Sequence, residues 1–204
     1  MISIYQLKPR FQRLVSPLLH SLVASGVTPN QVTLAALFLS LVYGTAIAWS
    51  PYQATMLWCM PLLLLLRMAL NALDGMLANA TRQKTKLGAM LNELADQLSD
   101  ACLYLPFATL PSVSPMLAVL VLFAGLLAEF AGVLALSIGA PRGFEGPMGK
   151  SDRAFCFGLL ALLIAAGVSA VWLNALLMTM LLLSLWTVVN RIRRALRFSV
   201  LPTP

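Results

Sequence analysis

The chain has 204 residues, of which 60% are apolar and only 10% are charged, and its mean hydropathy is +0.86. A soluble globular domain carries roughly 25% charged residues, so this composition excludes most soluble folds and is typical of a polytopic membrane protein. The net charge of +7 does not indicate a nucleic-acid partner, because the basic residues lie at the ends of apolar runs.

Residues 1–30 predict an amphipathic helix that lies in the cytoplasmic membrane interface. Its apolar residues recur at helical spacing, at Ile4, Leu7, Phe11, Leu14, Leu18 and Leu22. Lys8, Arg10 and Arg13 fall elsewhere on the same helix. A poorly ordered basic tail is the alternative. No signal peptide is expected, because no apolar run with a small-residue cleavage site follows the basic residues.

Six apolar segments follow and predict an all-α protein with six transmembrane helices. They cover approximately residues 32–49, 54–78, 88–110, 115–138, 152–168 and 170–190. A span takes about 20 residues, so the fifth is expected to begin within the loop before it. The predicted organisation is the interfacial helix at 1–30, a six-helix domain at 31–195 and a cytoplasmic tail at 196–204.

The basic residues predict the orientation of the spans. Thirteen of the fourteen lie at the N-terminus, in two connections and in the tail: Lys8, Arg10, Arg13, Arg82, Lys84, Lys86, Arg142, Lys150, Arg153, Arg191, Arg193, Arg194 and Arg197. The connections at 50–53, 111–115 and 168–171 carry no charge. This alternation is the positive-inside pattern. It predicts a multi-pass protein of the inner (plasma) membrane with both termini and the functional site facing the cytoplasm.

Two of the predicted spans carry polar side chains that a membrane normally excludes. In the second span they are Arg67, Asn71 and Asp74. In the third they are Asn92, Glu93, Asp96 and Asp100. Each set shares one helical face, and facing carboxylates would repel each other without a cation between them. Oxygen ligands with no histidine or cysteine nearby favour Mg²⁺, Mn²⁺ or Ca²⁺ over zinc; the alternative is that the acids pair with Arg67 and the loop cations.

The spacing of these residues resembles the motif of the CDP-alcohol phosphatidyltransferase family, D-x-x-D-G-x-x-A-R-(x8)-G-x-x-x-D-x-x-x-D. The same frame reads here Asn71-x-x-Asp74-Gly75-x-x-Ala78-Asn79-(x8)-Gly88-x-x-x-Asn92-x-x-x-Asp96. Every spacing matches, and three positions depart. Asn71 and Asn92 stand where the family has metal-binding aspartates, and Asn79 stands where it has arginine.

Two flanking segments strengthen the resemblance, which covers roughly residues 25–195. Pro29-Asn30-x-x-Thr33 resembles the P-N-x-x-T segment before the family's first span. Gly149-Lys150-x-x-Arg153 resembles a basic segment found in several members.

The resemblance implies transfer of a phosphatidyl group from a CDP-linked lipid, CDP-diacylglycerol, to an alcohol, with release of CMP, in phospholipid biosynthesis. It implies one or two Mg²⁺ or Mn²⁺ ions, which neutralise the diphosphate, and a carboxylate, Asp96, that takes the proton of the hydroxyl. The implied metal ligands are Asp74, Asp96, Asn71 and Asn92, with Glu93 and Asp100 as candidates to replace the two missing carboxylates. The implied CDP-binding residues are Asp74, Gly75, Ala78, Gly88, Asn79 and Thr33.

Four basic residues are candidates to bind a phosphorylated alcohol acceptor: Lys150, Arg153, Arg142 and Arg191. The resemblance also implies contact with membrane lipids and a homodimer. Because the altered motif supplies two carboxylates instead of four, a catalytically impaired relative that binds a nucleotide-lipid or a protein is one alternative. A small cation-coupled transporter is another, although it should show repeated or broken helices.

Overall fold

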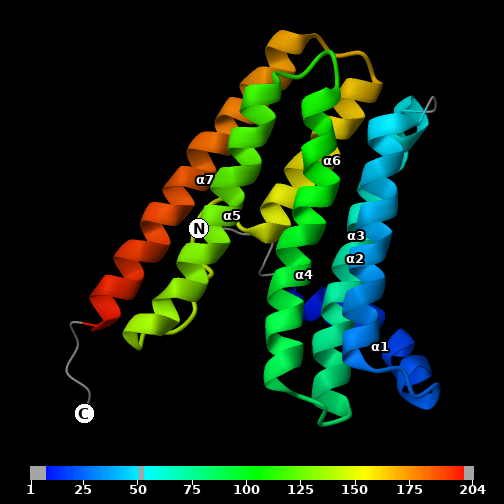
Figure 1. Cartoon of the computed structure of the whole chain (residues 1–204), viewed down its shortest axis with the longest axis vertical. Coiled ribbons are helices and arrows are strands. Elements are labelled where there is room, and N and C mark those ends of the chain that lie inside the picture. Colours follow the sequence, from blue (N-terminus) through cyan, green and yellow to red (C-terminus); the bar gives the residue numbers. More distant parts are fainter. Residues whose placement is uncertain (1–7, 51–52, 200–204) are drawn as a thin grey trace. The chain divides into compact units, whose positions relative to one another are not determined.

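The computed structural model describes residues 8–50 and 53–199, and within these ranges the chain is helical and contains no strand (Figure 1). Its contacts divide it into two compact units, one ending at Pro106 and the other beginning at Phe107. Each unit is described by itself. The prediction of an all-α protein is confirmed for the described residues.

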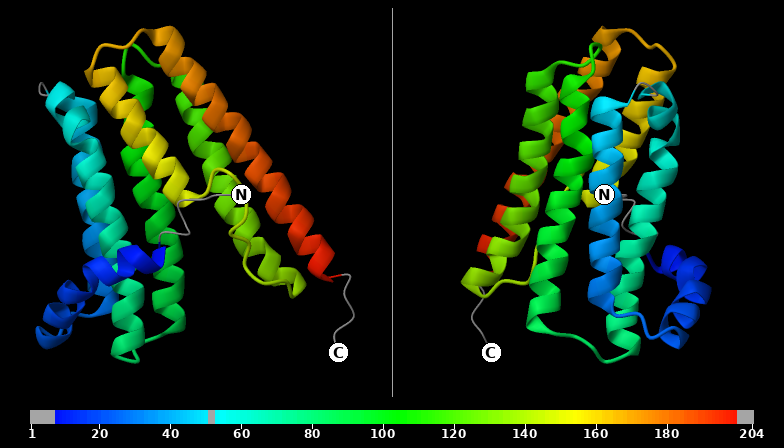
Figure 2. Two further views of the ribbon diagram at one scale, coloured as in Figure 1. Left: turned by 180° about the vertical axis from the view of Figure 1, so that it is seen from behind. Right: turned by 45° about the vertical axis from the view of Figure 1, so that its right-hand side comes forward.

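The first unit consists of α1 (Lys8–Ala24), α2 (Pro29–Trp49), α3 (Gln53–Ala80) and α4 (Lys86–Tyr104). α2 packs against both α3 and α4, and α1 packs against α3. α2, α3 and α4 run in alternating directions, while α1, in dark blue, lies crosswise near the end where α2 begins and α3 ends (Figures 1 and 2). The core beneath α1 is formed by Val15, Val32, Leu73 and Leu77.

Side-chain caps fix where two of these helices begin. Thr28 accepts a hydrogen bond from the Gln31 amide at 3.4 Å, and the Gln31 side chain accepts one from the Thr28 amide at 2.8 Å. This reciprocal capping box satisfies two backbone donors, and Pro29 follows in the first turn, where its fixed φ suits a helix start. Thr85 likewise accepts from the Gly88 amide at 2.9 Å and starts α4. The P-N-x-x-T segment is therefore the first turn of α2.

α3 ends in an unusual backbone conformation. The Gln83 amide donates to the Ala78 carbonyl at 3.1 Å and the Arg82 amide to the Asn79 carbonyl at 3.4 Å. This pattern ends many helices and requires a left-handed residue, which is usually glycine. Here that residue is Arg82, with φ +56°.

α2 and α4 approach each other at a glycine. A Cβ atom added at Gly44 would lie 2.0 Å from the carbonyl oxygen of Cys102. The two backbones are therefore in direct contact, as small residues allow between membrane helices. α3 faces α4 mainly through polar side chains, which are described with the functional site.

The second unit contains α5 (Pro115–Leu134), the short 3-10 helix η3 (Ala135–Ile138), α6 (Lys150–Ala165) and α7 (Ala170–Ser199), and the 3-10 helix η2 (Leu105–Thr109) leads into it from α4. α5 packs extensively against α7, and α6 packs against both (Figure 2). Ser114 caps α5 by accepting from the Leu117 amide. The Asp152 carboxylate accepts from the Gly149 amide at 3.1 Å and so starts α6.

Each predicted apolar segment corresponds to a helix, with shifts at the ends. The third is α-helical only to Tyr104 and continues as η2, and the last runs through the predicted boundary at residue 195 to Ser199. Within the described residues four helical stretches are long and apolar enough to cross a membrane: Pro29–Trp49, Gln53–Ala80, Pro115–Ile138 and Ala170–Phe198. α4 carries four charged residues and α6 has only 16 residues, and neither is among the four. The count of six spans stays a prediction.

The predicted interfacial helix is present in part as α1, while residues 1–7 and residues 200–204 of the predicted tail lie outside the described ranges. Phe11 and Leu22 pack against the core beneath α1. Leu14 and Leu18, which belong to the same predicted apolar face, are 75% and 55% exposed. The face is therefore divided between the protein core and the surroundings, and the position of α1 in a membrane interface stays a prediction.

Candidate functional site

A buried arginine of α3 contacts two acids of α4. Arg67 Nη1 lies 2.7 Å from Asp100 Oδ1, and Nη2 lies 3.9 Å from Asp96 Oδ1 and donates to the Asp96 backbone carbonyl at 2.9 Å. Arg67 and Asp100 are each only 2% exposed. The pairing of the acids with Arg67, which was the alternative to a bound cation, is thus present at Asp96 and Asp100.

Asn71, one turn further along α3, contacts the same α4 carboxylate. Its Nδ2 donates to Asp96 Oδ1 at 2.8 Å. The prediction that these faces of α3 and α4 meet is therefore confirmed by Arg67 and Asn71. We call Arg67, Asn71, Asp96 and Asp100 the Arg67 cluster.

Asp74, the first acid of the motif, is bound from α2. Thr33 Oγ1 donates to Asp74 Oδ2 at 2.9 Å, and both residues are buried. Forty-one positions separate them in sequence, so α2 supplies a direct contact to the motif. The sequence resemblance assigned both residues to one CDP-binding site, and the structure brings them together.

The remaining motif positions lie on a more open side of α3 and at the start of α4. Gly75 is exposed, and a Cβ atom there would meet no protein atom within 4 Å. Asn79 is also exposed, and its Nδ2 donates to the Gly75 carbonyl at 2.9 Å. A Cβ at Gly88 would lie 3.0 Å from the Asn30 and Thr85 side-chain oxygens. The space beside Gly75 of α3 is therefore open, whereas the space beside Gly88 of α4 is closed by the Asn30 side chain of α2. Ala78 is half-buried.

The carboxylate and amide oxygens of the first unit are of the kind that bind a divalent cation such as Mg²⁺ or Mn²⁺. Among the described residues no three acidic, histidine or cysteine side chains lie together as a metal-binding group. Asn92 Oδ1 is a buried acceptor with no hydrogen-bond partner within the described part of the chain. A buried carbonyl oxygen without a donor is costly, and amide and carboxylate oxygens are the ligands that Mg²⁺ and Mn²⁺ prefer. Glu93, next to Asn92, is half-buried.

In the second unit three arginines surround one buried glutamate of α5. Arg153 Nη1 of α6 lies 3.3 Å from Glu129 Oε1, and Arg191 Nη1 of α7 lies 3.3 Å from Glu129 Oε2. Arg142, from the loop before α6, is 3.8 Å from Oε2. Arg153 and Arg191 are 2% exposed, whereas the Arg142 side chain is 29% exposed. We call these four residues the Glu129 cluster, whose three arginines against one glutamate leave an excess of positive charge.

Two glycines of α5 make room for the buried guanidinium groups. A Cβ at Gly125 would lie 2.8 Å from Arg153 Cδ, and one at Gly132 would lie 3.2 Å from Arg191 Nη1 and 2.5 Å from the Gly143 carbonyl oxygen. Burial of both arginines therefore depends on the absence of side chains on this face of α5.

Sequence reasoning missed Glu129. Three of its four-residue cluster, Arg142, Arg153 and Arg191, were expected to bind an acceptor, but their shared counter-ion was not identified. The signal was available: Glu129 is an acid in the middle of the apolar segment 115–138, and an ionisable group there indicates a partner or a function.

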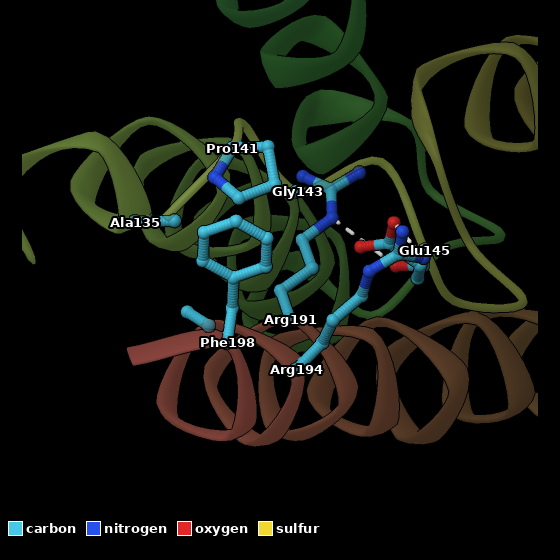
Figure 3. Close-up of a pocket in the computed structure, with 8 residues that line it drawn as sticks. Ala135, Pro141, Gly143, Glu145, Arg191, Arg194 and Phe198 are labelled. Carbon is cyan, nitrogen blue, oxygen red and sulfur yellow. Dashed lines mark hydrogen bonds and ion pairs between the residues drawn. The ribbon is translucent and has the colours of Figure 1, made fainter. Parts of the chain in front are cut away.

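A small pocket adjoins the Glu129 cluster near the end of α7. It is lined by Ala135, Pro141, Gly143, Glu145, Arg191, Arg194, Ala195 and Phe198 and by no residue of the motif. Figure 3 shows the Phe198 ring beside Pro141, with Arg191 and Arg194 extending toward Glu145. Arg191 Nε donates to the Glu145 backbone carbonyl at 3.2 Å, and Arg194 forms an ion pair with the Glu145 carboxylate. Lys150, the remaining acceptor candidate, is the first residue of α6 and half-buried.

The sequence matches known proteins over nearly its whole length. The family model for CDP-alcohol phosphatidyltransferase matches residues 26–189. Inner membrane protein YnbA of Escherichia coli is 46% identical over 199 residues, which cover 97% of this chain and 98% of that protein. An archaetidylinositol phosphate synthase of Pyrococcus horikoshii is 29% identical over 96 residues, which cover 47% of this chain and 48% of that protein.

Solved structures share the fold. The crystal structure of phosphatidylinositol phosphate synthase PgsA1 of Mycobacterium tuberculosis with CDP-DAG bound has a TM-score of 0.75 and 17% identity, and the match covers 94% of this chain and 99% of that one. The same enzyme in complex with manganese and citrate has a TM-score of 0.73 and 18% identity, with 93% of each chain covered.

Proposed function

The chain belongs to the CDP-alcohol phosphatidyltransferase family, and on that premise we propose that it transfers a phosphatidyl group from CDP-diacylglycerol to an alcohol and releases CMP. The observation that carries the proposal is the intact motif frame on two facing helices. Asp74 of α3 is bound by Thr33 of α2, and Asp96 of α4 is bound by Asn71 of α3. The fold shared with an enzyme crystallised with CDP-DAG supports the choice of donor.

We assign donor binding to the part of α3 around the open position Gly75, together with one residue each of α2 and α4. The proposed set is Asp74, Gly75, Ala78 and Asn79 of α3, Thr33 of α2 and Gly88 of α4. The exposed backbone at Gly75, where a side chain would enter unfilled space, leaves room for a headgroup close to the helix. Thr33 holds the Asp74 carboxylate in position from α2.

We assign the chemistry to Asp96 and the residues around it. A divalent ion, Mg²⁺ or Mn²⁺, supplies charge neutralisation for the diphosphate and the leaving CMP when bound. Asp74, Asp96, Asn71 and Asn92 are its proposed ligands, and Glu93 is a further candidate. Asp96 accepts the proton of the attacking hydroxyl. Asp100 is the weaker candidate for a ligand, because Arg67 is 2.7 Å away.

We assign the acceptor to the positive charge of the second unit. The excess positive charge of the Glu129 cluster favours a phosphorylated alcohol, such as glycerol 3-phosphate or inositol phosphate. Lys150 and Arg142 are the more accessible members of the proposed set. Arg153 and Arg191 are buried against Glu129. Their role in the proposed set is to hold in place the loop that carries Arg142 and the helix that carries Lys150.

The proposed setting is the inner membrane, with six spans, both termini in the cytoplasm and α1 in the interface. The four long apolar helices, the alternating basic connections and the likeness to an inner membrane protein support this topology. The exposed Leu14 and Leu18 of α1 suit burial among lipid headgroups. A homodimer is proposed from the family resemblance alone.

The test is release of CMP by the purified full-length protein from CDP-diacylglycerol, with Mg²⁺ or Mn²⁺ and a panel of free and phosphorylated alcohols. We expect turnover with one class of acceptor and its loss in Asp74→Asn and Asp96→Asn. Glu145→Gln, which alters an ion pair of the second unit near the surface, is the control that should retain turnover. Absence of turnover with every alcohol and both metals would overturn the proposal.

The second candidate is a binding protein that has lost catalysis. It is favoured by Asn71, whose amide donates to Asp96 where the family has a carboxylate, and by Asn79 in place of arginine. This candidate predicts saturable binding of CDP-diacylglycerol without CMP release. It also predicts that restoring Asn71→Asp, Asn79→Arg and Asn92→Asp together produces turnover.

A further inference from the structure

We propose that Arg67 is a built-in cation that takes the place of one divalent ion, so that the chain binds a single metal ion. The inference rests on the proposed function, because it concerns the same metal-binding motif. Two-metal sites stabilise both the attacking and the leaving oxygen with a pair of ions. In this chain the positive charge of Arg67 is proposed to stand in for the second ion of such a pair.

The guanidinium of Arg67 lies inside the protein against α4. Arg67 is the one basic residue of the chain that lies within a predicted span rather than at its end. It is 2% exposed, and its two terminal nitrogens contact Asp100 and Asp96 from the opposite helix. A cation within 4 Å of two carboxylates one helical turn apart reduces the repulsion between them, as a bound metal ion would.

The charges around Asp96 limit how many divalent ions can bind. Four carboxylates in the family frame carry four negative charges, which two divalent ions would balance. This chain keeps two of them, Asp74 and Asp96, and Asp100 adds a third that Arg67 offsets. The net charge of minus two matches one divalent ion. Even with Glu93 included, two ions beside Arg67 would leave excess positive charge in a largely buried site, which is unfavourable.

Asn71 can donate a hydrogen bond, which the aspartate of the family frame cannot. An aspartate at this position could approach Asp96 only with a cation between the two carboxylates. Asn71 instead donates its own N–H to Asp96 Oδ1 at 2.8 Å. A direct hydrogen bond therefore replaces the contact that a shared ion would make. Asn71 and Arg67 together occupy the side of Asp96 that faces α3.

The test counts bound Mn²⁺ on the purified full-length protein by electron paramagnetic resonance of the ion that remains free. We expect one tightly bound Mn²⁺ in the natural protein. Arg67→Gln removes the guanidinium and leaves Asp96 and Asp100 as repelling neighbours, so it should bind two. Arg67→Gln with Asp100→Asn restores the net charge and should return to one, and Arg67→Lys should remain at one. The thermal midpoint of Arg67→Gln should rise with Mn²⁺ by more than that of the natural protein.

The outcomes separate this inference from the proposed function. Two ions in the natural protein, or one in a folded Arg67→Gln variant, would overturn the role of Arg67 and leave the transferase proposal intact. No bound ion in the natural protein would overturn both. If Arg67→Gln folds only when Mn²⁺ is present, a metal ion can replace the guanidinium and the inference is supported. If it fails to fold with and without Mn²⁺, the replacement does not occur and the inference is wrong.

Discussion

At the scale of single residues, Glu129 is the counter-ion for two buried arginines, and this determines what its loss should cost. Glu129→Gln removes the carboxylate that Arg153 and Arg191 both contact while they remain 2% exposed. Breaking a buried pair by removing one partner costs about 3–5 kcal/mol. We expect a large drop in the thermal midpoint of the detergent-solubilised protein.

Glu145→Gln is the matched control for this prediction. Glu145 pairs with Arg194, which is 62% exposed, and exposed pairs contribute about 0–1 kcal/mol. Its midpoint should stay close to that of the natural protein. Equal shifts for the two variants would mean that the buried arginines are stabilised by something other than Glu129.

The hydroxyl of Thr33 is predicted to matter for activity through Asp74. Thr33→Val keeps the shape of the side chain and removes the donor that binds Asp74 Oδ2 at 2.9 Å. A hydrogen bond to a charged group contributes about 1.5–3 kcal/mol, so kcat/KM for the donor should fall about 10- to 100-fold. Thr45→Val on the same helix, where the hydroxyl donates to the Val42 carbonyl, should have little effect.

Lys150 tests the assignment of the acceptor. If Lys150 binds the phosphate of the acceptor, Lys150→Ala should raise the KM for the acceptor about tenfold or more and change the KM for CDP-diacylglycerol much less. Arg197→Ala, an exposed basic residue in the last turn of α7, is the control. Equal increases for both substrates would assign Lys150 to the diphosphate instead.

At the scale of helices, the end of α3 stores strain that a single substitution should release. Arg82 has φ +56°, and a side chain in the left-handed region costs about 1–2 kcal/mol relative to glycine. Because glycine also gains freedom in the unfolded chain, the net effect of Arg82→Gly should be a stabilisation of about 0.5–1 kcal/mol. Thermal unfolding in detergent measures it, and Gln83→Gly should instead be neutral or destabilising.

The starts of the helices could be predicted from the sequence, because capping residues lie where the apolar runs begin. Pro29 and Pro115 each follow a capping hydroxyl at the start of an apolar run, and α2 and α5 begin there. Length alone could not place the end of α4, since the apolar character continues into η2 while the hydrogen bonding changes. The exposure of Leu14 and Leu18 could not be predicted from the sequence either. Periodicity shows that residues share one helical face, but not how much of that face a neighbouring helix covers.

The candidate site was predictable where spacing along one helix decides the outcome. The separations in the motif correctly indicated that Asn71 faces α4. The family resemblance, and not the spacing, placed Thr33 in one site with Asp74. Pairing between distant segments was not predictable in the same way. Arg67 had several acids within reach, and only the packing of α3 opposite α4 selects Asp96 and Asp100. Glu129 had a recognisable signal, but its three arginines come from three separate segments.

At the scale of the whole molecule, the charge alternation predicts which loops can be reached from outside the cell. The three natural cysteines would first be replaced: Cys59, Cys102 and Cys156. Single cysteines at the exposed positions Met116 and Ala170 should then react with a membrane-impermeant maleimide on intact cells. A cysteine at Gln83, between α3 and α4, should react only after the membrane is opened. Labelling of Gln83→Cys on intact cells would reverse the proposed orientation.

The fit between the glycines of α5 and the arginines beside them also imposes an order on how this sequence can evolve. While Arg153 is present, alanine at Gly125 brings a methyl group to 2.8 Å from a buried side chain, and such overpacking is selected against. In a lineage where Arg153 has already been replaced by a smaller residue, the same alanine becomes neutral and accumulates. The arginine can then return only after glycine has been restored, because its space has been filled. Loss of the buried arginine followed by drift at the glycine therefore fixes the order of any reversal, in which glycine must come back before arginine.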